Sequence, residues 1–289
     1  MQELIETVIP VFTIIFVGYA IGKIKKKVDM QSFIDLIVYL AAPCLIFSSI
    51  ARSDINLTEF STIAVAALAI ILIMALLALL ILKLTKLDKN GLCLPMTFGN
   101  TSYLGYPVAL FAFGMDGLSR AVVYDMMNSL IIFSLGIYII HHRNELQEAF
   151  KVPLLYAVVI GLVVNLLKIP VPSAIFEPIE MIGLITIPLA LLVLGYKLTE
   201  IKVEAAKIAC LASVFKILGG LSIAFVIINL FSIDGLTRDI ILLQAAMPSA
   251  VMAMILASKY ERDASLVASV VLITTVISMV TIPVILYVL

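Results

Sequence analysis

The feature that most constrains this sequence is a series of ten apolar runs, each about as long as a membrane-spanning helix. A helix crosses the roughly 30 Å hydrocarbon core of a bilayer in about 20 residues. The runs are too long for strands, and they lack the alternation of apolar and polar residues that strands show. They cover residues 4–22, 31–51, 60–82, 91–114, 118–140, 152–169, 174–197, 207–231, 238–258 and 264–288. We therefore predict an all-α polytopic membrane protein with ten transmembrane helices and no soluble domain.

The overall composition supports this class. Apolar residues make up 63% of the chain and charged residues 13%, whereas soluble domains contain about 45–50% and about 25%. Such a chain has too little charge to cover a soluble enzyme, a nucleic-acid binder or a disordered regulator. The 19 basic residues equal the 19 acidic ones, so we expect no nucleic-acid partner. The three cysteines lie within apolar runs without metal-ligand spacing, and we expect core thiols and no metal site of cysteines.

The basic residues of the predicted loops indicate the orientation. The loops on the side that faces residues 23–30 hold fourteen Lys and Arg residues, and the opposite loops hold four. Basic loops stay in the cytoplasm. We call the basic side "side A" and predict that it is cytoplasmic, with both termini extracytoplasmic and the protein in the cell membrane.

The chain also contains signs of an internal repeat. Three residue pairs recur at nearly one spacing, which is half of the chain. The pairs are Pro43 with Pro188 and Asp35 with Glu180, each 145 residues apart, and Pro107 with Pro248, 141 residues apart. Five helices per half is an odd number, so the second copy would enter the bilayer from the other side, as in many secondary transporters. We predict two inverted repeats, 1–145 and 146–289; the alternative is a chance alignment of prolines.

The fourth and ninth predicted helices contain helix-breaking sequences. The fourth carries a cluster of Gly, Asn, Thr and Ser that ends at Pro107, and the ninth carries Pro248 after Gln244. Unwound backbone at membrane depth is tolerated where it lines a cavity or is buried in protein. We predict that the two breaks meet near the midplane, where helix N-termini with free N–H groups favour an anion. The alternative is a pair of packing kinks.

Three motifs resemble those of the auxin efflux carrier family, which includes the plant PIN-type carriers and prokaryotic members. They are Asn100-Thr101-x-x-x-Gly105-x-Pro107, Gln244-Ala245-Ala246-Met247-Pro248, and the stretch of residues 38–49 around Pro43. The resemblance covers essentially the whole chain, and the short connection at 141–151 is similar to that of prokaryotic members.

This resemblance implies a ten-helix fold related to the bile acid:sodium symporters, with broken crossover helices 4 and 9. It implies a scaffold domain, a transport domain, elevator-type alternating access and a homodimer. It also implies organic anions as substrates, such as auxin in plants and small carboxylates in some bacterial members. The Asp and Lys that plant members carry on the third helix are absent from residues 61–82, which makes auxin itself a poor expectation.

The resemblance further implies which residues bind the substrate. Asn100 corresponds to a substrate-contacting Asn, Val251 to a substrate-lining backbone position, and Asn128 to a polar position that faces the site. The flanking motif residues complete the predicted substrate-binding set, which is Asn100, Thr101, Pro107, Asn128, Gln244, Pro248 and Val251.

Two charges lie inside predicted spans, where charges are costly and usually functional. Lys216 lies near the middle of the eighth helix, where it would balance a carboxylate or attract the substrate anion. Asp125 shares a helix face with Asn128. It could carry a coupling proton, ligate Na⁺ together with Asn100 and Gln244, or pair with Lys216. We predict no other cofactor.

These observations favour a secondary carrier for a small organic anion, with its substrate bound where the fourth and ninth helices meet. Two alternatives stay open. A passive uniporter or channel-like facilitator with the same fold would have the same sequence features. An intramembrane enzyme is disfavoured because the chain lacks the motifs H-E-x-x-H and G-x-S-x-G and a paired Asp-rich motif, and no ATP-binding loop is present.

Overall fold

The computed structural model describes residues 2–25, 28–87, 90–141 and 153–289. Within these residues the secondary structure consists of helices and a single isolated bridge. The helical elements of the first half are α1 (Gln2–Ile24), α2 (Met30–Leu36), η1 (Ile37–Ala41), α3 (Ala42–Ala51), α4 (Leu57–Leu84), η2 (Asn90–Leu92), α5 (Cys93–Thr97), α6 (Gly105–Ile131), η3 (Ile132–Gly136) and α7 (Ile137–His141). Those of the second half are α9 (Leu154–Leu166), α10 (Ser173–Leu184), α11 (Thr186–Leu198), α12 (Ala206–Leu230), α13 (Gly235–Ala245), α14 (Val251–Lys259) and α15 (Ala264–Val288).

Several of these helices are long and apolar enough to cross a membrane. The described residues contain six such segments, which are Met30–Ala51, Leu57–Leu84, Gly105–His141, Ser173–Leu198, Ala206–Leu230 and Ala264–Val288. Val8–Ile24 and Leu154–Leu166 are shorter apolar helices. The all-α, multi-pass class is therefore confirmed, whereas the count of ten spans and the inverted repeat stay predictions.

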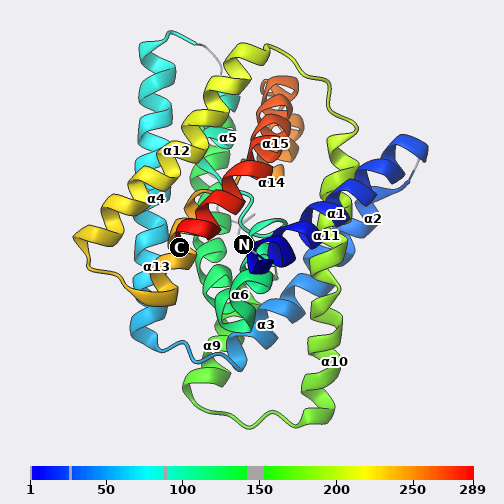
Figure 1. Ribbon diagram of the computed structural model, residues 1–289, viewed down its shortest axis with the longest axis vertical. Helices are drawn as coiled ribbons and strands as arrows, with labels where there is room; N and C mark the ends of the chain where they lie inside the picture. Colours follow the sequence, from blue (N-terminus) through cyan, green and yellow to red (C-terminus); the bar gives the residue numbers. More distant parts are fainter. Residues whose placement is uncertain (1, 26–27, 88–89, 142–152) are drawn as a thin grey trace.

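The helices form two groups by their mutual contacts, and each group draws on both halves of the sequence. The "first group" consists of α1, α2 with η1 and α3, α9, α10 and α11. The "second group" consists of α4, α5, α6 with η3 and α7, α12, α13, α14 and α15. Figure 1 shows α1, α2, α10 and α11 toward one side and α4, α12 and α13 toward the other. Contacts between the groups involve α6 above all, which touches α1, α3 and α9.

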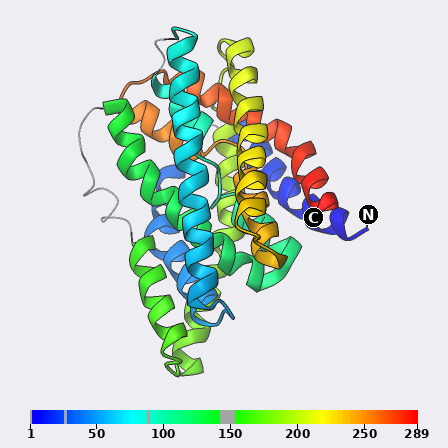
Figure 2. The ribbon, with the colours of Figure 1, turned by 90° about the vertical axis from the view of Figure 1, so that its left-hand side faces the viewer.

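The outer wall of the second group is built by two long helices. Figure 2 shows α4 and α12 side by side along the long axis of the molecule, and the two helices are in contact. Both views place the two chain termini near one another, and α1 contacts α15.

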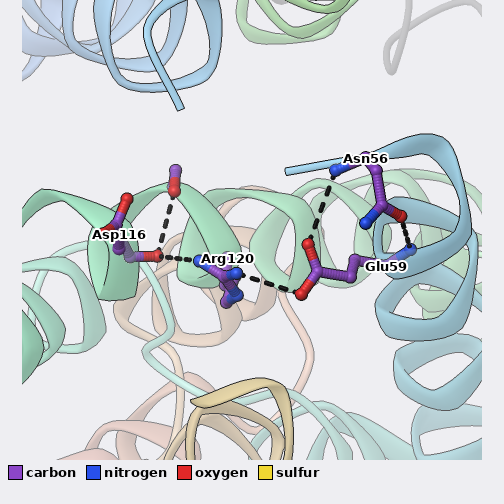
Figure 3. A network of polar contacts seen from close by, with 5 residues as sticks. Asn56, Glu59, Asp116 and Arg120 are labelled. Carbon is purple, nitrogen blue, oxygen red and sulfur yellow. Dashed lines mark hydrogen bonds and ion pairs between the residues drawn. The ribbon is translucent and has the colours of Figure 1, made fainter. Parts of the chain in front are cut away.

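A polar network joins α4 to α6 within the second group. Arg120 is buried, and its guanidinium donates to Glu59 Oε1 at 3.0 Å and to the carbonyl of Asp116 at 3.1 Å. Figure 3 shows the Glu59 carboxylate between Arg120 and Asn56, with which it forms a capping box at the start of α4. The network fixes the start of α4 to α6 next to Gly114, whose φ of +66° kinks α6. This kink separates the predicted fourth and fifth helices.

In the first group, glycines bring α1 and α11 into backbone contact. A Cβ atom on Gly195 would lie 2.0 Å from the carbonyl oxygen of Ile15, and one on Gly18 would lie 2.2 Å from that of Leu192. Small residues at such contacts allow membrane helices to pack closely. The two helices therefore form a tightly packed unit against which the second group lies.

Candidate functional site

Both predicted breaks are present in the structure. Between α5 and α6 the chain is unwound at residues 98–104, and between α13 and α14 it is unwound at 246–250. Pro107 lies in the first turn of α6, where its missing N–H needs no acceptor, so the unwound stretch precedes this proline and contains the predicted cluster of Gly, Asn, Thr and Ser. Pro248 lies within its unwound stretch.

The two unwound stretches pair with each other. The backbone N–H of Asn100 donates to the carbonyl of Pro248 at 2.6 Å, and the N–H of Ala250 donates to that of Phe98 at 2.9 Å. Gly99 and Ser249 thereby form an antiparallel bridge. These bonds satisfy backbone groups that helix breaks leave free, which buried backbone requires. Segments almost 150 residues apart in the chain are thus held together in the protein interior.

A cavity lies beside this pairing and between the two helix groups. The empty space within it, open mouth included, is about 810 Å³. The second group lines it with Gly99, Asn100, Ser102, Tyr103, Tyr106, Asp125, Asn128, Ser129, Ile132, Phe133, Ala250, Val251 and Met252. The first group lines it with Ile37, Val38, Ala42, Leu154, Thr186 and Ala190. The cavity therefore has a polar floor at the breaks and mainly apolar walls.

The cavity extends toward side A. Leu154 is the first residue of α9, and Phe133 lies on the part of the predicted fifth helix that leads to His141. Ile37 and Val38 lie in the first half of the helical segment Met30–Ala51. These helix ends all adjoin the predicted basic loops.

Asn100 combines deep burial with an unused donor. Its side chain is 2% exposed and lines the cavity, and its amide nitrogen has no hydrogen-bond partner. Leaving a buried donor unpaired costs about 1–3 kcal/mol. An unpaired buried donor on a residue that lines a cavity is therefore a candidate contact for a ligand.

The start of α14 adds backbone donors at the same place. Val251 is the first residue of this helix, and Val251 and Met252 both line the cavity. The first amides of a helix have no acceptor within the helix, and no side chain caps α14. At the other break, the N–H groups of Gly105 and Tyr106 already donate to carbonyls of the unwound stretch. The α14 terminus is thus the one that offers amides to the cavity, instead of both helix starts as we predicted.

Asp125 organises the unwound stretch after α5. Its carboxylate is buried and accepts hydrogen bonds from the hydroxyls of Thr101 and of Tyr106, the latter at 2.8 Å. The Asn128 amide donates to Thr101 Oγ1 at 3.0 Å and to the carbonyl of Gly99 at 3.1 Å. Both Asn128 amide hydrogens are therefore used within the protein, which gives this residue a positioning role. Sequence reasoning missed Tyr106, although it directly precedes Pro107.

Lys216 lies at the other break and does not pair with Asp125. It is 2% exposed, and its ammonium group donates at 3.1 Å to the carbonyl of Ala245, which is the last residue of α13. Among the described residues it forms no ion pair with a carboxylate. The predicted direct pairing of Lys216 with Asp125 is therefore not formed in this structure, and the roles of balancing another carboxylate or attracting the substrate anion stay predictions. A cation at a helix C-terminus is favourable because this end carries partial negative charge.

The remaining predicted residues lie near the cavity but not in its lining. Gln244 is buried against Gly105, on which a Cβ atom would lie 2.4 Å from Gln244 Oε1, and neither of its amide atoms has a partner. Thr101 and Pro248 lie in the unwound stretches, and Pro107 lies in the first turn of α6. The structure thus brings Asn100, Asp125, Asn128 and Val251 to one cavity and places the others behind it. No cluster of three or more His, Cys, Asp or Glu residues able to hold a metal occurs in the described part.

Known proteins are similar to this chain along nearly its whole length. A family model described as membrane transport protein matches residues 3–150 and 143–286. An uncharacterized transporter of Methanocaldococcus jannaschii is 29% identical in an alignment 295 residues long with gaps, which covers 95% of each chain. An uncharacterized transporter of Methanothermobacter thermautotrophicus is 28% identical in an alignment 291 residues long with gaps, which covers 96% of each chain. The chain therefore belongs to the membrane transport protein family of the auxin efflux carriers, and it is a membrane transporter and not an enzyme.

Proposed function

We propose that this protein is a secondary-active transporter of a small organic carboxylate, which binds in the cavity where the two breaks meet. The observation that carries this proposal is the unpaired amide nitrogen of Asn100, buried beside the start of α14. These donors suit a carboxylate group, because anions bind to free N–H groups at helix N-termini. The apolar walls from Ile37, Phe133 and Leu154 suit the carbon skeleton of an organic anion.

Asp125 implies that a cation accompanies the substrate. A carboxylate in the cavity lining would repel an anionic substrate, and the repulsion is strong in a medium of low polarity. A proton on Asp125 or a Na⁺ ion beside it removes this repulsion. Asp125 holds Thr101 and Tyr106 at the break, so a change in its charge also acts on the backbone that forms the site. This arrangement supports coupling of the substrate to H⁺ or Na⁺.

The movement we propose is of the elevator type. The cavity lies between the two helix groups, and the polar residues around both breaks belong to the second group. If the second group slides past the first, the substrate travels with Asn100 and the α14 terminus. The substrate site then becomes accessible from the opposite side of the membrane. Two inverted repeats, ten spans, a homodimer and extracytoplasmic termini in the cell membrane belong to this proposal as predictions.

Transport by purified protein in liposomes tests the proposal. We expect saturable uptake of a mono- or dicarboxylate that is accelerated when unlabelled substrate is present on the other side. Flux that grows linearly with concentration and shows no such counterflow would favour a channel-like facilitator. Uptake measured with and without Na⁺ at two pH values separates the two coupling ions. In Asp125→Asn we expect the dependence on the coupling ion to disappear, and an unaltered dependence would exclude Asp125 as the coupling group.

A further inference from the structure

The first group contributes a buried hydroxyl to the cavity that sequence reasoning did not single out. Thr186 is the first residue of α11, and its side chain is 4% exposed. Thr186 lines the cavity, and its buried hydroxyl oxygen has no hydrogen-bond partner. Buried hydroxyls nearly always have a partner. Like the Asn100 amide on the opposite wall, this hydroxyl is therefore left for a group that enters the cavity.

Thr186 differs from the other first-group residues in the lining. Ile37, Val38, Ala42, Leu154 and Ala190 are all apolar. Within the described lining, Thr186 is therefore the polar side chain that the first group offers. The other polar contacts belong to the second group, which carries Asn100, Asp125 and the start of α14.

We propose that Thr186 donates a hydrogen bond to the substrate carboxylate in one transport state and thereby sets a higher affinity on side A. The inference rests on the proposed function. The second-group contacts travel with the substrate, whereas Thr186 stays with the first group. A bond between Thr186 and the substrate therefore exists in the state described here, whose cavity extends toward side A, and is broken when the groups slide.

The proposed inverted repeat explains why the opposite state would lack such a contact. The position 145 residues before Thr186 is Ala41, just as Pro43 corresponds to Pro188. In an inverted repeat, the opposite state places the equivalent part of the other half beside the substrate. Ala41 has a methyl group and cannot donate. The affinity is thus asymmetric because one of two equivalent positions holds a hydroxyl.

The test measures half-saturating concentrations from each side in proteoliposomes of known orientation. A hydrogen bond to a charged group changes affinity by about tenfold or more. We expect Thr186→Val, which keeps the shape, to raise the half-saturating concentration on side A about tenfold and to change it less than about twofold on the other side. Thr186→Ser should behave like the wild type. Ala41→Ser adds a hydroxyl at the equivalent position and should lower the value on the other side.

Several outcomes overturn the inference. Equal shifts on both sides for Thr186→Val, or no shift at all, would show that Thr186 makes no state-specific contact. If Thr186→Val has wild-type half-saturating concentrations while Asn100→Ala binds the carboxylate more weakly, this inference alone is rejected and the proposed function stands. A wild-type protein that binds and transports no carboxylate would overturn both. Thermal unfolding of each variant without substrate checks that folding is unchanged.

Discussion

Replacing Lys216 by Met removes a buried charge while keeping a side chain of similar length. Lys216 is 2% exposed, and its ammonium group donates to the carbonyl of Ala245 at 3.1 Å. No carboxylate pairs with it among the described residues. A structural role and a functional role for this charge predict different results for Lys216→Met.

Two opposing terms decide the effect on stability. Loss of a hydrogen bond to a charged donor destabilises by about 1.5–3 kcal/mol. A lysine near the centre of a membrane helix is disfavoured by about 2.5–3.5 kcal/mol, and this penalty disappears with Met. The terms nearly cancel, so we expect the free energy of unfolding to change by less than about 1 kcal/mol.

Substrate affinity should respond differently. The C-terminal end of α13 carries roughly half a negative charge, and a cation near it contributes about 1 kcal/mol. This end lies at the break whose Pro248 carbonyl holds the Asn100 backbone. Without Lys216 the uncompensated end disfavours an anion nearby, so we expect an affinity loss of about fivefold.

Thermal unfolding of the purified variant, followed by titration with the transported carboxylate, measures both quantities. Lys207→Met is a matched control, because Lys207 lies exposed near the start of the same helix. It should change neither. A destabilisation beyond about 3 kcal/mol together with unchanged affinity would refute this reasoning and assign Lys216 a structural role.

Three further predictions concern the scaffold and the loops. Arg120→Met should lower the free energy of unfolding by about 1–2 kcal/mol, because Glu59 is partly exposed and the pair lies between the buried and surface cases; chemical denaturation measures it, and an unchanged value would contradict it. Gly195→Ala should destabilise by about 1–3 kcal/mol by pushing α11 off α1, and a melting temperature equal to that of wild type would count against this contact. The hydroxyl and backbone N–H of Ser32 hold the pKa of Asp29 below its usual value. This lowered pKa means that the cap of α2 stabilises the protein above the usual pKa of Asp and is lost only as pH falls through the lowered value, which an NMR titration of Asp29 would show; an unshifted titration would disprove it.

The positions of the breaks could be predicted from sequence because their causes are local. Polar and glycine residues before Pro107, and Pro248 after Gln244, are incompatible with a continuous helix in lipid. The side chains that meet there could be predicted less well, because pairing depends on the packing of distant helices. The same sequence reasoning selected Asn100 and Asp125, which line the cavity, and Gln244, which packs behind it against Gly105.

Two residues show what sequence patterns do not contain. For Lys216 the sequence left open a carboxylate partner and attraction of the substrate anion, whereas its partner in the structure is a backbone carbonyl that becomes free because α13 ends at Ala245. Thr186 looks like an ordinary helical threonine, whose hydroxyl usually bonds to the preceding turn. That it has no such bond and faces the cavity became visible only with the three-dimensional arrangement.

The central claim is that Asn100 binds the transported carboxylate, and substrate-induced thermal stabilisation of Asn100→Ala tests it most directly. The backbone bonds of Asn100 to Pro248 and Gly105 remain in this variant, and its amide nitrogen has no partner to lose. We therefore expect the melting temperature without substrate to stay near that of wild type. We expect the affinity for the carboxylate to fall at least tenfold, since a hydrogen bond to a charged group is lost. Stabilisation by the substrate at the same concentrations as in wild type would contradict the account.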